Sequence, residues 1–473
     1  MKKLLLLLPG LVLHLILFSQ DKWDLRRCVE YAMANNISIK QADVQARLSK
    51  LTLNQSKLMQ IPTLIGGVGG AVNSGHNLDP ATYNLSTVTY TANTYSLSSS
   101  VTVFNFFSLR HLIEANRYSW EAALANSDKL KNDISLNVAN AYLQVLLATQ
   151  QTNTSLNQLR LSQNQLEITR KQVNAGTLPE LNAAELEAQV AQDSANYISA
   201  RATIEQNILS LEAYMGMDAS IPFEVTTPAV ENIPIEKLSD LQPEVVYSMA
   251  LTNQPLQRMD KLQVQSAHKN VDANKGALYP TFTLSGSLAS NYISTYETVN
   301  PNSFYPIIDT IGQVVGTGNK VIAEGVGYSY KKIPYFSQLN QNFSQSVGIN
   351  INIPIFNNGS LRTSYEKSKL NLRNTELQRD LDNLTLKQNI YQAYTAALSA
   401  LQKFEANKLS AAATAKSFEF ARKRYNVGML NTIDLLTNQN NYFNAQINLL
   451  YAQFDYVFKM KVLEFYKGMG IKL

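Results

Sequence analysis

Alternating apolar and polar residues mark four segments of this chain as β-strands. The clearest segment is 342–356, in which mainly apolar residues face one side and small uncharged polar residues face the other. A period of two is the signature of a strand, because successive side chains point to opposite faces. Residues 94–104 and 281–288 follow the same pattern, and a weaker, glycine-rich strand is expected after Pro62.

The four strands are expected to pair as two hairpins, over about 62–106 and about 280–356. Residues near 74–93 and 292–341 then become the loops at the hairpin tips, and we expect these loops outside the cell. The second loop is the longer one and is rich in tyrosine, glycine and asparagine. Aromatic residues gather at strand ends, where a membrane interface would lie. They are Phe104, Phe106, Phe107, Tyr279 and Phe356.

Two very long helices are expected directly after the hairpins, because residues 108–173 and 360–426 contain neither proline nor glycine. At about 1.5 Å per residue, each helix could extend roughly 100 Å. Apolar residues in the first run recur with a period of about 3.5, which is typical of coiled-coil packing. The positions are Ile134, Val138, Ala141, Val145, Thr152, Leu156, Leu159, Leu166 and Val173.

A glycine ends each long helix, and another helix begins directly after it. Gly176 and Gly428 can adopt the left-handed conformation that ends a helix. The helices that follow are expected over about 178–215 and 431–467, and Asn431 is positioned to cap the second one. Each half of the chain therefore contains a helical hairpin whose end lies far from the strands.

The two halves follow one plan, which indicates an internal duplication. Short sequences recur at matching places, such as Ser108-Leu109-Arg110 and Ser360-Leu361-Arg362. We divide the chain into a signal segment, a first structural repeat, an inter-repeat linker and a second structural repeat. Their bounds are 1–19, 20–215, 216–243 and 244–473. The linker is proline-bearing and is expected on the outside of the structure.

Composition and charge narrow the class of protein. Charged residues make up only 16% of the chain and hydrophobic residues 45%, a balance that excludes a disordered chain. A net charge of +5 spread over 473 residues offers no field for nucleic acid. Residues 1–19 have the layout of a secretory signal peptide, with cleavage expected after Ser19. The single cysteine, Cys28, cannot form an internal disulfide and is expected to be buried.

The strands suit a membrane crossing. A length of about 10 residues spans a bilayer, and the uncharged polar face suits a water-filled lumen. The alternative is a half-buried soluble sheet covered by helices. In lipid, an open sheet edge leaves unpaired N–H and C=O groups, each at a cost of several kcal/mol. Four strands cannot close alone, since known bacterial barrels begin at about 8 strands, so the membrane interpretation predicts an oligomer.

Together these features resemble the TolC-type outer-membrane efflux proteins, and the resemblance covers essentially the whole mature chain. Its carriers are the duplicated order of elements, the Pro62-Thr63 and Pro280-Thr281 steps, a Phe-Asn turn after each second strand, and Arg424-Tyr425-Asn426-Val427-Gly428. The resemblance implies an α+β membrane protein with four strands per chain. A trimeric, twelve-stranded transmembrane β-barrel, surrounded by outer-membrane lipid, would continue into a long α-helical coiled-coil tunnel in the periplasm.

The resemblance also implies partners. The homotrimer would be the exit duct of a tripartite efflux or type I secretion system. A periplasmic adaptor protein and an inner-membrane pump of RND or ABC type would dock on it and open it. The docking positions at the hairpin ends are Ala175, Gly176, Thr177, Val427, Gly428 and Met429. For both glycines, simple helix capping is the alternative role.

A periplasmic constriction is implied as well. Asp434 matches an aspartate ring of the family, and three copies would place three carboxylates around one axis. Tyr425 and Glu185 are expected to contribute to this gate. The alternative for Asp434 is an ordinary acid in a first helical turn, where the helix dipole favours it. Thr437 and Leu430 stand where the family can carry an aspartate and an arginine.

Two other classes of protein fit the sequence less well. A soluble periplasmic coiled-coil scaffold would explain the long helices, but not why each one leads directly out of an alternating strand. An enzyme lacks support, because His76, His111 and His268 are scattered and no phosphate loop or catalytic triad pattern is present. We therefore expect no catalytic residue, no cofactor and no metal site. The transported substrate stays open.

Overall fold

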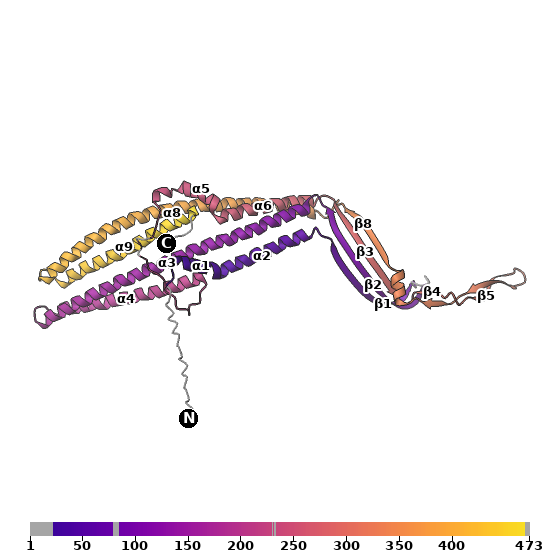
Figure 1. Cartoon of the computed structure of the whole chain (residues 1–473), viewed down its shortest axis with the longest axis horizontal. Helices are drawn as coiled ribbons and strands as arrows, with labels where there is room; N and C mark the ends of the chain where they lie inside the picture. Colours follow the sequence, from indigo (N-terminus) through magenta and orange to yellow (C-terminus); the bar gives the residue numbers. More distant parts are fainter. Residues whose placement is uncertain (1–21, 79–84, 229, 231–232, 469–473) are drawn as a thin grey trace, which may run out of the picture. The chain divides into compact units, whose positions relative to one another are not determined.

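The computed structural model describes residues 22–78, 85–228, 230 and 233–468, so the predicted signal segment lies outside the described residues. Two compact units make up the chain, shown in Figure 1. The helical unit contains the chain up to Lys50, Tyr118–Gln265 and the chain from Arg373 onward. The sheet unit contains Leu51–Arg117 and Ser266–Leu372. Each unit thus draws on both halves of the sequence.

The shorter helices form two pairs of equal length. Helices α1 (Leu25–Asn35) and α5 (Pro243–Asn253) each have 11 residues. Helices α2 (Ile37–Leu58) and α6 (Pro255–Gly276) each have 22 residues. A single turn of 3-10 helix, η2 (Leu238–Asp240), precedes α5.

The longer helices are paired in the same way. Helices α3 (Ser108–Asn174) and α8 (Ser360–Asn426) each have 67 residues. Helices α4 (Glu180–Met215) and α9 (Thr432–Lys467) each have 36 residues. These four lie where the sequence predicts long helices. Among the helices in the described residues, none combines the length and the apolar character that a membrane span requires.

The sheet unit is built on one antiparallel sheet with the strand order β1-β2-β3-β8. The strands are β1 (Thr63–Leu78), β2 (Leu85–Phe104), β3 (Thr281–Ile293) and β8 (Ser344–Asn352). In Figure 1 they lie side by side, with β1 and β8 at the edges. The fold is therefore α+β, as expected.

The strand ends differ from the prediction. Most of the predicted loop 74–93 is strand, because β1 continues to Leu78 and β2 already begins at Leu85. Small polar residues conceal the alternation in this stretch. At the other end, β8 is shorter than the predicted 342–356, since Pro354 has no N–H to donate to a ladder.

The predicted loop 292–341 is structured too. Strand β4 (Glu297–Val299) pairs with β7 (Tyr330–Lys332), and β5 (Tyr305–Gln313) pairs with β6 (Lys320–Gly327). Helix α7 (Tyr335–Gln341) follows, and its Gln338 side chain exchanges two hydrogen bonds with the backbone of Ile293 in β3. In Figure 1 the β5–β6 hairpin extends past the ends of the sheet strands.

The core of the helical unit includes the segment between the repeats. Phe223, Val225, Val230 and Ile233 are buried among residues of α1, α3, α4 and α9. The proline-bearing segment 216–243 therefore packs apolar residues inward between its prolines, although most of its described residues are exposed or half-buried. Cys28 is buried in the same core, as predicted, and this burial raises the pKa of its thiol to about 12.

Candidate functional sites at the hairpin ends and on the sheet

The two hairpins of the helical unit end in the same turn geometry. Gly176 after α3 and Gly428 after α8 have φ angles of +72° and +73°, which glycine adopts without steric cost. The N–H of Thr177 donates to Gln172 O at 3.0 Å, and an equivalent bond of 2.9 Å follows Gly428. Such bonds satisfy carbonyl groups that a helix end leaves open. The predicted glycine caps are thus confirmed.

The six predicted docking residues are all exposed at these two turns. They are Ala175, Gly176, Thr177, Val427, Gly428 and Met429. A Cβ atom added at either glycine would meet nothing within 4 Å. Figure 1 shows the two turns at one end of the helical unit.

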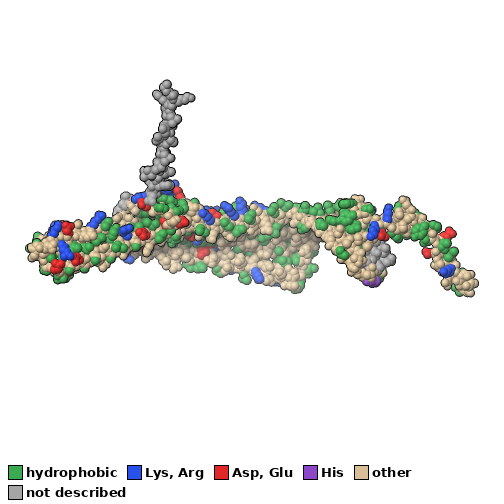
Figure 2. Space-filling view, turned by 90° about the horizontal axis from the view of Figure 1, so that it is seen from below, with side chains coloured by type: hydrophobic (Ala, Val, Ile, Leu, Met, Phe, Trp, Pro, Cys, Tyr) green, Lys and Arg blue, Asp and Glu red, His purple; other side chains and the backbone are tan. Residues whose placement is uncertain are grey.

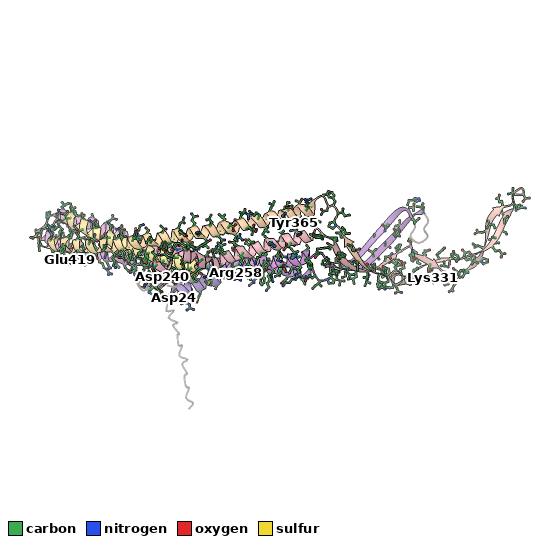
Figure 3. The ribbon with its side chains drawn as sticks, turned by 90° about the horizontal axis from the view of Figure 1, so that it is seen from above. Asp24, Asp240, Arg258, Lys331, Tyr365 and Glu419 are labelled. Atoms are coloured by element: carbon green, nitrogen blue, oxygen red, sulfur yellow. The ribbon has the colours of Figure 1, made fainter. Side chains whose placement is uncertain are left out.

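Charged side chains surround these turns. Glu419, which Figure 3 labels near the same end of the helical unit, accepts a hydrogen bond of 2.7 Å from Lys423. This bond and the positive charge of Lys423 hold the pKa of the Glu419 carboxyl below its usual value. On the other hairpin, Arg170 forms ion pairs with Glu180 and Glu187 and so joins α3 to α4.

Tyr425 is buried where the two hairpins meet. Its ring packs with Phe418 and Leu435. Its hydroxyl lies 3.3 Å from Thr169 Oγ1 on α3 and 3.5 Å from Thr432 Oγ1 on α9. Within one chain, this residue therefore connects the α3–α4 hairpin to the α8–α9 hairpin.

The other two predicted gate residues lie on α9 and α4. Asp434 is exposed in the first turn of α9, and its N–H donates to Asn431 Oδ1 at 2.7 Å, which confirms Asn431 as the cap. Glu185 is half-buried on α4. Among the described residues, no hydrogen bond or ion pair joins Asp434, Glu185 and Tyr425 to one another.

A buried polar layer between α3, α4 and α9 was not predicted. The Asp193 carboxylate accepts hydrogen bonds from Ser162 Oγ, from Gln158 Nε2 at 3.5 Å and from Gln189 Nε2 at 2.9 Å. Gln439 on α9 donates to Ser162 Oγ at 2.8 Å. The layer therefore links three helices through hydrogen bonds instead of apolar contacts.

This layer corrects the apolar stripe predicted for α3. The stripe holds over Val138, Ala141, Val145, Thr152 and Leu159, which are buried, but Leu156 and Leu166 are only half-buried. Most of the buried positions toward the hairpin end are polar. They are Thr152, Ser155, Gln158, Ser162, Gln165 and Thr169. The spacing of Asp193 from Leu186 and Ala200, seven residues each way and both buried, could have revealed its inward position.

The sheet separates its residues into two distinct faces. None of its four strands contains Asp, Glu, Lys or Arg. Large apolar side chains such as Val68, Val347 and Ile349 are exposed on one face. On the other face, hydroxyl groups pair across strands, as in the 2.8 Å contact between Ser287 and Ser346. Figure 2 shows the charged side chains mainly over the helical unit.

The strand-end aromatic cluster expected from the sequence is partly formed. Phe104 contacts Phe106 and Phe107, and Phe106 stacks on Tyr279 with ring centroids 4.7 Å apart. The side chain of Phe356 is exposed. Across the part of the chain that the structure describes, no group of three or more His, Cys, Asp or Glu residues is placed to hold a metal ion.

Comparisons with known proteins cover most of the chain. The family model "Outer membrane efflux protein" matches residues 29–217 and 246–460. "Outer membrane efflux protein BepC" of Brucella suis is 24% identical over 397 residues, which cover 82% of this chain and 74% of BepC. "Toxin and drug export protein A" of Aggregatibacter actinomycetemcomitans is 22% identical over 443 residues, covering 92% and 84%. The solved CmeC outer membrane channel of Campylobacter jejuni shares the fold, with a TM-score of 0.74, 16% identity and coverage of 95% and 86%.

Proposed function

Because the chain belongs to the outer membrane efflux protein family, we propose that three copies of it form one duct across the outer membrane and the periplasm. The observation that carries this proposal is the uncharged sheet with two unpaired edges, β1 and β8. Lipid cannot satisfy the N–H and C=O groups of such edges. Other copies of the same sheet can do so.

The strand directions support closure by identical copies. All three pairings in the sheet are antiparallel and the number of strands is even. Strand β8 of one copy therefore runs antiparallel to β1 of the next copy. Three copies of four strands give a twelve-stranded barrel, with the hydroxyl-bearing face toward the lumen and the apolar face toward lipid.

We also propose that the chain is an internal structural repeat. The equal lengths of α1 and α5, α2 and α6, α3 and α8, and α4 and α9 support it. Equivalent side chains also make equivalent contacts. Asn36 donates to Tyr214 O at 2.8 Å in the first half, and Gln254 donates to Tyr466 O at 3.1 Å in the second.

The partners follow from the hairpin ends. We propose that a periplasmic adaptor contacts the six exposed turn residues and links the duct to an inner-membrane pump. The names of the relatives, an efflux protein and a toxin and drug export protein, support export as the purpose. They leave the cargo of this chain open.

Opening of the duct would occur at the same end. Asp434 of three copies would form the constriction, with Glu185 beside it and Tyr425 holding the two hairpins of each chain together. The hydrogen-bonded layer around Asp193 joins α3, α4 and α9, so a shift of these helices would have to rearrange its hydrogen bonds. Docking of the adaptor and the pump would shift the hairpins and widen the passage.

Membrane fractionation tests the proposal against its main alternative, a soluble periplasmic scaffold. We expect the protein in the outer-membrane fraction, retained through a high-salt wash and released only by detergent. A scaffold would be released by salt, because surface charge contacts are screened at high ionic strength. Release by salt would therefore refute the channel.

A further inference from the structure

We propose that the apolar face of the sheet holds one lipid acyl chain in a defined groove, an inference that rests on the proposed membrane location. The sheet groove is a depression of about 340 Å³ on this face. Its lining residues include Leu64, Leu97, Ser99, Gly286, Leu288 and Val347.

The register of the strands creates the groove. One row across the sheet consists of Leu64, Ser99, Gly286 and Val347, one residue from each strand. The two central members have little or no side chain, whereas the outer two are large. In the next row Leu97 lies opposite Leu288. The floor over Ser99 and Gly286 is therefore walled by four apolar side chains.

A second depression of about 330 Å³ adjoins the first and shares Leu97 and Leu288 with it. It is lined in addition by Val68, Tyr95 and Phe343, among other residues. The two depressions together extend the apolar surface along the strands toward α7.

This second depression leads to polar groups. The Tyr95 hydroxyl lies 2.5 Å from the Tyr335 hydroxyl of α7, and Ser290 Oγ donates to Leu339 O of α7 at 2.6 Å. Asn93 also donates to the Tyr335 hydroxyl, at 3.4 Å. The groove thus runs from an end walled mainly by apolar side chains, with Ser99 and Gln345 also in its lining, to a cluster of hydroxyl and amide groups.

That polarity fits an amphiphile better than a protein partner. A lipid would lay its acyl chain between Leu97, Leu288 and Val347 and its headgroup near the tyrosine hydroxyls. Tyrosine is the residue that membrane proteins place at this level, because its ring is apolar and its hydroxyl is wet. A second copy of the chain would pair with the edges β1 and β8, and the floor of the groove lies between them on β2 and β3. We therefore assign the groove to a phospholipid acyl chain.

Filling the floor tests the assignment. A Cβ at Gly286 would contact Ser346 O at 3.6 Å and Val347 Cγ2 at 3.9 Å, so the backbone can accept Gly286→Leu while the new side chain occupies the groove. Gly348 lies on the opposite face of β8, and a Cβ there meets nothing within 4 Å. Gly348→Leu is the matched control. If Gly286→Leu fails to assemble, Gly66→Leu fills the second depression, where a Cβ also meets nothing within 4 Å.

The purified assembly is exchanged into detergent with phosphatidylethanolamine whose acyl chains are brominated, and native mass spectrometry counts the lipid retained. The bromine mass separates lipid from detergent. We expect one retained lipid per chain in the wild type and in Gly348→Leu, and at least tenfold lower retention in Gly286→Leu or Gly66→Leu. Equal retention in all variants, or none in the wild type, would mean boundary lipid only and would overturn the site.

A fluorescent reporter on the same face distinguishes the absence of the lipid site from an error in the proposed membrane location. The two native tryptophans, Trp23 and Trp120, lie outside the sheet and are replaced by phenylalanine. Ile351→Trp then places a single tryptophan on the apolar face, outside the groove. Brominated lipid in vesicles should quench its fluorescence whether or not the groove binds. An unquenched tryptophan would contradict the membrane location as well.

Discussion

Asp260 in α6 is a buried acid in unfavourable surroundings. Its side chain is 3% exposed, and among the described residues its Oδ2 atom has no hydrogen-bond partner. Burial, reinforced by the negative charge of Asp382, raises the pKa of its carboxyl to about 6, although Arg379 opposes the shift. Because the pKa of Asp260 is higher in the folded state than in the unfolded state, the contribution of this carboxyl to the free energy of unfolding is fully present below about pH 4. That contribution is lost as the pH rises through about 6.

The substitution Asp260→Asn should therefore stabilise the protein at neutral pH. A shift of about two pKa units corresponds to roughly 3 kcal/mol as an upper bound. Thermal unfolding in detergent should show a higher midpoint for the variant at about pH 7.5 and a much smaller gain at about pH 4.5. A gain of the same size at both pH values would show that ionisation of Asp260 is not the cause.

Asp434 allows a second test with one residue. If three copies surround the passage, Asp434→Asn removes three negative charges from one ring. Conductance in planar bilayers should lose cation selectivity, whereas the helix cap from Asn431 stays intact, because it uses the backbone N–H of residue 434. Unchanged ion selectivity would remove Asp434 from the constriction.

Single residues were predictable where their chemistry is local. The glycines at 176 and 428, the Asn431 cap and buried Cys28 depend on a few neighbours in sequence or on side-chain type alone. Asp193 was not predictable in this way, because its charge is accommodated by donors from α3 and α4. A polar residue at a core position resembles a solvent-exposed one until its partners are known.

At the scale of elements, the role of the turn after α8 in docking can be tested separately from its role in the stability of the fold. Gly428→Trp should weaken capture of the adaptor in a pull-down by at least tenfold while the assembly stays intact. The left-handed conformation itself costs a non-glycine residue about 1–2 kcal/mol. Gly359→Trp is a matched control, since Gly359 has the same φ of +73° and equally open space, but lies between β8 and α8. Equal losses in both variants would point to backbone strain instead of docking.

The two faces of β8 provide another element-scale test. Ile349→Lys would place a charge on the apolar face, at a cost of about 2–4 kcal/mol per chain near the middle of a bilayer. Asn350→Lys would place the same charge on the opposite face. We expect the first variant to lose outer-membrane assembly and the second to assemble normally, as measured by heat-modified migration of the extracted protein. Similar assembly of both variants would contradict the assignment of the faces.

Element types were easier to predict than element ends. The alternation of β8 and the proline-free lengths of α3 and α8 are long-range patterns, so they were evident in the sequence. The polar stretch between β1 and β2 and the segment 292–341 have no such pattern. Their strands depend on pairing, as in β5 with β6, and pairing is decided by tertiary contacts.

At the scale of the whole molecule, the compact units and the sequence halves divide the chain differently. Each half contributes two strands to the four-stranded sheet, so neither half can form that sheet alone. The sheet itself is still open at two edges. The free edges, the uncharged strands and the family membership all support the proposed completion of the sheet by further copies of the chain.

The mass of the detergent-extracted particle tests that completion most directly. Native mass spectrometry, with detergent removed in the gas phase, should give three times the mass of the mature chain. This particle should persist on dilution, because its strands are joined by hydrogen bonds that lipid or detergent cannot replace. A stable particle with the mass of one chain would contradict the account, since one sheet would then remain unclosed in a membrane.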